Sequence, residues 1–147
     1  AFAQRTGLLS IADDSGLEID ALFGEPGVKS ARYAGEYASD VDRIRYVLSK
    51  LQGVSWNNRK AKFRSVLALA DAHGVIKVFH GECHGYIAFE SKGLGGFGYD
   101  PIFYLPSIGK SMSELSFDQK NAISHRGIAV KQAVSYLKHW KCDIQAM

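Results

Sequence analysis

Short apolar runs separated by polar or glycine-rich stretches dominate the first third of this 147-residue chain. Residues 8–12 (LLSIA) form such a run and predict a buried strand. The run stops at the acidic stretch 13–16 (DDSG), which we interpret as a turn because Asp, Ser and Gly are common turn residues. Residues 24–38 are rich in glycine and alanine, and they predict a loop.

Two later stretches have the period of an amphipathic helix. The first follows Ser39 or Asp40, either of which can cap it, and Gly53 is expected to end it. A further helix is expected to start near residues 116–118, with a second one, or its continuation, over residues 124–140. The apolar positions that define these faces are Ile44, Val47, Leu48 and Leu51 in the first helix, and Val130, Ala133, Val134 and Leu137 in the last.

The middle of the chain has the pattern of successive strands. Residues 62–70 and 75–80 are expected to be strands joined by a turn at 72–74, and residues 84–90 a third strand. A short strand is expected at 102–105. Because helices and strands mix, the pattern predicts an α/β or α+β fold with a mixed sheet, and the chain length fits a single domain spanning all residues.

Composition narrows the range of partners. The net charge is +3 and the basic residues are scattered, whereas a nucleic-acid groove needs a basic stripe, so we expect a small anionic ligand rather than a nucleic acid. No apolar run approaches the roughly 20 residues of a membrane span, and no secretory leader is visible. Cys83 and Cys142 have no metal-ligand spacing, which favours free thiols in a reducing cytoplasm.

Asp13 and Asp14 are the first candidates for chemistry. Carboxylates at a strand end suit a hard cation such as Mg²⁺, which prefers oxygen ligands and shares them with substrate phosphates. An ordinary surface turn explains the same residues, and the motif alone does not decide between the two.

The glycine-rich stretch 93–98 (GLGGFG) matches G-x-G-x-x-G, the pattern of a dinucleotide site. The residues that follow it, Tyr99, Asp100 and a proline, do not predict a helix, so no helix N-terminus would face a pyrophosphate. We interpret the glycines as a bend that lets Phe97 and Tyr99 face a flat ligand, with a turn carrying core aromatics as the alternative.

Lys120, His125 and Arg126 flank the expected helix boundary, where Ser124 can serve as N-cap. The guanidinium of Arg126 offers several donors in a fixed fork, which suits a carbonyl oxygen or a phosphate. A structural or surface role for the histidine remains the alternative.

The order of these motifs carries more information than any one of them. The chain reads IADDSGLEIDAL, PGVKSARYAG, GGFGYDPIF and KNAISHRGIAV in succession. This series resembles the inosine/xanthosine triphosphate pyrophosphatases, the Ham1-like hydrolases, over about residues 9–137. The resemblance implies an elongated mixed β-sheet with flanking helices in two lobes around a cleft, and a homodimer. It also implies magnesium-dependent hydrolysis of non-standard purine nucleoside triphosphates to the monophosphate and pyrophosphate.

The resemblance also implies roles for individual residues. Asp14 would be the general base and, with Asp13, a metal-linked carboxylate. Phe97 would stack on the base, and Arg126 would meet the carbonyl at C6 of inosine or xanthine, where adenine has an amino group. The expected substrate contacts are Ser15, Phe97, Gly98, Tyr99, Asp100, Lys120, His125 and Arg126.

The resemblance is incomplete at its N-terminal end. It implies a T/S-G-N-x-x-K loop for the triphosphate and a helix with a metal-site glutamate, and residues 1–7 (AFAQRTG) match neither. We therefore expect an N-terminally truncated member with an unpaired sheet edge that dimerises. Two functions stay open: a working pyrophosphatase, or a catalytically impaired member that binds a nucleotide or a protein partner without efficient turnover.

Overall fold

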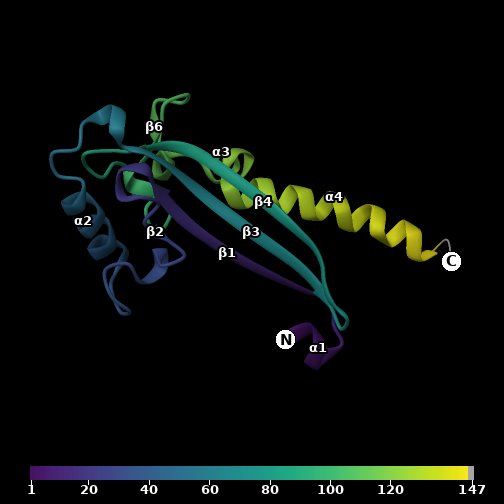
Figure 1. Ribbon diagram of the computed structural model, residues 1–147. Helices are drawn as coiled ribbons and strands as arrows, with labels where there is room; N and C mark the ends of the chain where they lie inside the picture. The colour runs from purple at the N-terminus through teal and green to yellow at the C-terminus, as the bar shows by residue number, and fades with distance from the viewer. Residues whose placement is uncertain (146–147) are drawn as a thin grey trace.

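The structure is a computed structural model that describes the backbone of residues 1–145 and the side chains of residues 1–140. A long curved ribbon of three strands dominates it, with α2 near one end of the ribbon and α4 running along it (Figure 1). The strands are β1 (Ser10–Ile19), β2 (Pro26–Gly27), β3 (Lys60–Asp71), β4 (Gly74–Ile87), β5 (Phe103–Leu105) and β6 (Lys110–Ser111). The α-helices are α1 (Phe2–Thr6), α2 (Asp40–Lys50), α3 (Phe117–Ile123) and α4 (His125–Gln145).

The strands form one six-stranded sheet in the order β2-β1-β3-β4-β5-β6. The expected α/β class is confirmed, and every strand pair among the described residues is antiparallel. Two residues connect β3 to β4, which leaves no room for the crossover that a parallel pair requires. The expected parallel pairs of a mixed sheet are therefore not found within residues 1–145.

The helices α2, α3 and α4 begin at the residues that the sequence indicated, whereas the short helix α1 was not expected. Ser39 and Asp42 form a reciprocal capping box at the start of α2. Ser116 and Gln119 form a second one at the start of α3. Ser124 has an extended backbone between α3 and α4, so the His-Arg pair stands in the first turn of a new helix.

One face of the sheet is apolar at both ends and polar in its middle. Successive side chains of a strand alternate between the faces, so the odd-numbered residues of β1 share this face with their partners on β3 and β4. Ser15, Ser65 and Gly81 lie in register across the middle. The apolar clusters on either side are Leu17, Ile19, Phe63 and Cys83 with Ile44 and Val47 of α2 and Leu51 directly after it, and Leu67, Leu69 and Phe79 with Ala129 and Ala133 of α4.

The opposite face of the sheet carries charges. Lys62 lies 3.4 Å from a carboxylate oxygen of Glu18 and 3.2 Å from one of Glu82. Arg64 and His84 extend this network on the same face. The side chains of this network are partly exposed to solvent, and exposed ion pairs contribute at most about 1 kcal/mol each. This face is therefore a solvated surface rather than a second core.

Several expectations from the sequence were confirmed and others were wrong. The first helix with its apolar face and the turn at 72–74 were correct. The loop expected at 24–38 is correct except for the two-residue strand β2 and a short 3-10 helix at Ser30–Arg32. The acidic stretch 13–16 is not a turn, because it lies inside β1 and pairs with β3 without a break. The strand expected at 84–90 is not a separate strand, because residues 84–87 are the end of β4, whose pairing with β3 continues through Gly81, and residues 88–90 lie beyond β4.

Another error concerns the buried faces. Val130 and Val134 of α4, expected on the buried face, are 40% and 46% exposed. Ala133, expected on the same face, is buried, and Ala129 is buried with it. The strand expected at 8–12 begins only at Ser10, and Leu9 and Ile11 are exposed rather than buried.

Of the two cysteines, Cys83 is a buried free thiol whose pKa burial raises to about 11. The side chain of Cys142 lies outside the described residues. No helix in the described part of the chain is long and apolar enough to cross a membrane.

Gly81 permits α4 to lie directly on the sheet, which generates a stability prediction. A Cβ at this position would overlap the carbonyl oxygen of His125 and lie 2.9 Å from the amide nitrogen of Ala129. The backbone of α4 cannot shift locally to make room for this Cβ. We therefore expect Gly81→Ala to lower the free energy of unfolding by about 1–3 kcal/mol in urea denaturation.

His84→Ala is the matched control, because His84 lies on the same strand with a side chain that is 72% exposed. It should change the free energy of unfolding by less than about 0.5 kcal/mol. Equal stabilities for the two variants would show that the contact at Gly81 is not tight.

Candidate functional site

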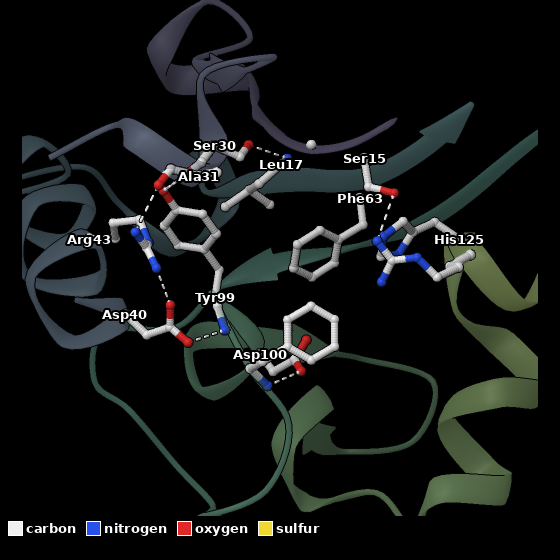
Figure 2. A pocket seen from close by; sticks show the side chains of 14 residues that line it. Ser15, Leu17, Ser30, Ala31, Asp40, Arg43, Phe63, Tyr99, Asp100 and His125 are labelled. Carbon is white, nitrogen blue, oxygen red and sulfur yellow. Dashed lines mark hydrogen bonds and ion pairs between the residues drawn. The ribbon is translucent and has the colours of Figure 1, made fainter. Parts of the chain in front are cut away.

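A pocket of about 250 Å³ opens where the polar row of the sheet meets α4. β1, β3, α2, α4 and the glycine-rich loop all contribute residues to its lining. Figure 2 shows Arg43 on one side, Ser15 and His125 on the other, and the rings of Phe63 and Tyr99 between them. A cavity with aromatic walls and polar groups at its edges suits a flat heterocycle with hydrogen-bonding groups on its rim.

Arg126 connects α4 to the middle of β1. Its Nε donates to Oδ2 of Asp13 at 2.6 Å, and one terminal nitrogen donates to Oγ of Ser15 at 3.4 Å. Asp13 also accepts hydrogen bonds from the hydroxyls of Ser65 and Ser15 at 2.9 and 3.2 Å. Burial raises the pKa of Asp13, but the hydrogen bonds from Arg126 and the two serines outweigh burial and hold this pKa below its usual value.

The other terminal nitrogen of Arg126 has no hydrogen-bond partner among the described residues. Arg126 lines the pocket, and a guanidinium carries five N–H donors. The Asp13 carboxylate fixes the side chain, so the remaining donors are available to a ligand in a set direction.

His125 forms part of the pocket wall and is 8% exposed. Its ring stacks on Phe63 with 4.9 Å between the ring centroids and 16° between the ring planes. Burial, with a smaller effect from the neighbouring Arg126, lowers the pKa of His125 to about 4, so the ring is neutral at pH 7. Its Nδ1 is buried without a hydrogen-bond partner among the described side chains. Since buried polar atoms are nearly always paired, this nitrogen is a candidate ligand contact.

The turn 97–100 places an exposed ring beside these groups. Phe97 is 60% exposed, and its ring centroid lies 4.4 Å from Nζ of Lys120 and 5.8 Å from the guanidinium carbon of Arg126. Asp100 is buried; its carboxylate accepts the amide of Phe97 at 2.8 Å and pairs with Lys120. Lys120 therefore neutralises Asp100 and supports the turn from the side of α3.

The structure brings most of the expected site residues together and separates one. Asp13 and Lys120 reach the pocket through their ion pairs with Arg126 and Asp100. Asp14 points to the opposite face of β1, on which Val66 is its partner in register. The expected residues that line the pocket are Ser15, Phe97, Gly98, Tyr99, Asp100, His125 and Arg126.

No group of three His, Cys, Asp or Glu side chains able to hold a metal ion exists in the described part of the chain. Asp13 and Asp14 cannot chelate one ion together from a regular strand, because their side chains diverge. Asp14 is exposed and has no protein partner among the described side chains, whereas Asp13 is occupied by Arg126.

The sequence did not indicate seven residues of the pocket lining, which are Gly16, Leu17, Ser30, Ala31, Asp40, Arg43 and Phe63. Asp40 had been considered only as a helix cap, and Phe63 only as part of a strand. Its phase within the strand pattern could have placed Phe63 on the covered face, but no sequence signal pairs residue 40 with the loop that contains residue 98.

The low pKa of His125 generates a prediction about stability and pH. The unfolded chain binds this proton with a pKa of about 6.5 and the folded chain with one of about 4. Protonation therefore favours the unfolded state, so the free energy of unfolding is fully retained above pH 6.5 and falls as the pH decreases from 6.5 toward 4. The contribution of His125 to this loss should reach about 3 kcal/mol.

Urea unfolding of the wild type and of His125→Gln at several pH values measures this contribution. Three charged side chains act on His125: Arg126 and Lys120 lower its pKa, and Asp13 opposes them. The variant should lose the part of the pH dependence between 6.5 and 4 that the histidine supplies. An imidazole NMR titration with its midpoint near 6.5 would contradict the prediction.

Comparison with known proteins identifies relatives whose sequences match most of this chain. The sequence profile of the Ham1 family matches residues 1–136. A dITP/XTP pyrophosphatase from Desulforamulus reducens is 51% identical over 137 residues, which make up 93% of this chain and 68% of the relative. Another from Halalkalibacterium halodurans is 52% identical over 137 residues, with 93% of this chain and 71% of the relative covered.

Solved structures agree with the sequence relatives. A Ham1 protein from Coxiella burnetii superposes with a TM-score of 0.88 at 46% identity, covering 93% of this chain and 71% of that protein. The Staphylococcus aureus Ham1 protein superposes with the same TM-score at 45% identity, covering 93% and 70%. With a profile match over most of its length and relatives at half identity, the chain belongs to the Ham1 family.

Proposed function

We propose that this chain hydrolyses non-standard purine nucleoside triphosphates, such as dITP, ITP and XTP, to the monophosphate and pyrophosphate. Relatives that share about half of its residues are dITP/XTP pyrophosphatases. The observation that carries the proposal is the aromatic-walled pocket with Arg126 at its rim, fixed by Asp13 and still holding free donors. In such a site an aromatic ring can stack on a purine, and the N–H groups of Arg126 can form hydrogen bonds with the edge of the base.

Recognition of the base rests on Phe97 and Arg126. Stacking on an aromatic ring contributes about 1–3 kcal/mol per base and does not distinguish one purine from another. Discrimination comes from Arg126, whose N–H groups can donate to the carbonyl at C6 of hypoxanthine or xanthine. Adenine has a donor there, and a buried donor left unpaired costs about 1–3 kcal/mol, which rejects ATP roughly 5- to 150-fold.

We propose Asp14 as the catalytic carboxylate that acts as general base and holds Mg²⁺. Mg²⁺ is commonly bound by one or two protein carboxylates together with substrate phosphates. Asp14 fits that requirement because it is exposed and free of protein partners within the described residues. Asp13 is held by Arg126 and lies on the other face of β1, so Asp14 would hold the ion without it. When bound, the ion would neutralise phosphate charge and lower the pKa of a coordinated water.

A second function is favoured by the geometry of the acidic pair. The described residues supply one free carboxylate at this position and no cluster of three metal ligands. Such a chain could bind the nucleotide through the pocket of Phe97, His125 and Arg126 and turn it over poorly. Binding without turnover is therefore the alternative that the first experiment has to separate from catalysis.

Pyrophosphate release from ITP, dITP, XTP and ATP with Mg²⁺ tests the proposal. We expect the inosine and xanthosine substrates to be preferred over ATP roughly 5- to 150-fold in kcat/KM. Arg126→Gln should remove most of this preference, because the fixed donor is lost. Asp14→Asn should lower kcat roughly 10²- to 10³-fold with nucleotide binding retained, because it removes a charge that acts at the reacting phosphate.

Arg64→Gln is the matched control for Arg126, since Arg64 lies on β3 but on the charged face away from the pocket. It should leave the base preference unchanged. Equal rates for ITP and ATP in the wild type would contradict the role of Arg126. Binding of ITP without pyrophosphate release would favour the alternative function.

We further propose that the chain forms a homodimer through the outer edge of β1. β2 pairs only with Leu17 and Glu18, so residues 10–16 have no partner strand on that side among the described strands. Ile11, next to this edge, is 55% exposed. Unpaired strand edges with apolar side chains are templates for pairing with another chain.

Sedimentation equilibrium should show a dimer, and Ile11→Lys should weaken it by roughly tenfold or more, because two added charges would face each other across the shared edge. Val75→Lys is the control, since Val75 is 68% exposed near the β3–β4 turn, away from the free edge of β1. A monomer at high protein concentration would contradict the proposal.

A further inference from the structure

Asp40 joins the first turn of α2 to the turn that carries Phe97. The amide of Gly98 donates to Oδ2 of Asp40 at 2.6 Å, across 58 positions of sequence. Gly98 has a φ of +60°, a left-handed conformation that favours glycine. The hydrogen bond between Gly98 and Asp40 therefore depends on the left-handed backbone conformation of Gly98.

Arg43 holds the Asp40 carboxylate in place. Its guanidinium forms an ion pair with Oδ1 of Asp40 and donates to the carbonyl oxygens of Ala31 and Ala38 at 2.8 and 2.6 Å. The Arg43 side chain is 17% exposed, so it is largely enclosed by these partners. The ion pair and the hydrogen bond from Gly98 lower the pKa of Asp40, which stays charged at neutral pH.

A second connection fixes the next residue of the turn. The buried hydroxyl of Tyr99 donates to the carbonyl oxygen of Ser30 at 2.8 Å. Gly98 and Tyr99 are thus tied to α2 and to the loop before it, as Figure 2 shows for Tyr99 and Asp40. Phe97 itself is 60% exposed, and the contacts of its ring are with the cationic groups of Lys120 and Arg126, so the backbone of the turn sets the direction of the ring.

We propose that Asp40 is a positioning residue of this site, which places the Phe97 ring over the pocket by holding the Gly98 amide. Arg43 supports it by fixing the carboxylate. The inference rests on the proposed function in one respect, that Phe97 stacks on the base of the nucleotide. Asp40 itself acts only through Gly98 and needs no contact with substrate.

Three variants separate this role from ordinary helix stability. Asp40→Ala removes the acceptor, and Asp40→Asn keeps one acceptor oxygen without the charge. Asp42→Ala is the matched control, because it breaks the capping box of the same helix but has no contact with the pocket. Hydrogen exchange of the Gly98 amide and calorimetric binding of ITP provide two independent measurements.

We expect Asp40→Ala to raise the exchange rate of the Gly98 amide about tenfold and to weaken ITP binding about tenfold, the effect of losing one charge-assisted hydrogen bond. Asp40→Asn should recover part of both losses. Asp42→Ala should leave both close to wild type, although it also destabilises α2. If turnover is measurable, KM should rise in Asp40→Ala while kcat changes less.

Unchanged Gly98 exchange in Asp40→Ala, or an equal increase in Asp42→Ala, would overturn the proposal. Weakened ITP binding of the same size in both variants would overturn it as well. If the wild-type chain does not bind ITP, the proposed function fails. The exchange rates of Gly98 in the same variants then still decide whether Asp40 holds the turn.

Discussion

The close approach of α4 to the sheet at Gly81 is the contact on which the site depends. The backbone of His125 lies against this glycine, where any Cβ would overlap it. The approach is possible because a row of small residues, Ser15, Ser65 and Gly81, interrupts the apolar face. The first turn of α4 therefore packs directly on the sheet between the two hydrophobic clusters, and the side chain of Arg126 reaches β1.

That geometry assigns different tasks to two adjacent carboxylates. β1 alternates strictly between the faces of the sheet, so Asp13 shares a face with Ser15 and Arg126 whereas Asp14 faces solvent. Asp13 binds the guanidinium of Arg126. This ion pair sets the direction of the Arg126 N–H groups that have no partner among the described residues. Among the described side chains none pairs with the carboxylate of Asp14, which suits a role toward phosphate or metal rather than toward the base.

The opposite wall of the pocket is built by long-range polar contacts instead of helix packing. Asp40 and Arg43 of α2 hold the glycine-rich turn, and Lys120 supports it from α3 through Asp100. The contacts of Asp40 with Gly98 and of Lys120 with Asp100 each join segments 20 or more residues apart, and they satisfy a backbone amide and a buried charge. Together with the buried ring of Tyr99, these contacts determine where the ring of Phe97 lies.

Local patterns in the sequence were enough to predict most of the helices and strands and to identify the family. Capping residues such as Ser39 and Ser116 marked helix starts because capping is a local interaction, and the order of the motifs identified the Ham1 resemblance. Tertiary structure alone decided that residues 13–16 stay in a strand, since the pairing with β3 overrides their turn propensity. It also decided which carboxylate meets Arg126 and that Asp40 reaches Gly98. Those outcomes depend on register and on contacts between distant segments, neither of which local propensity encodes.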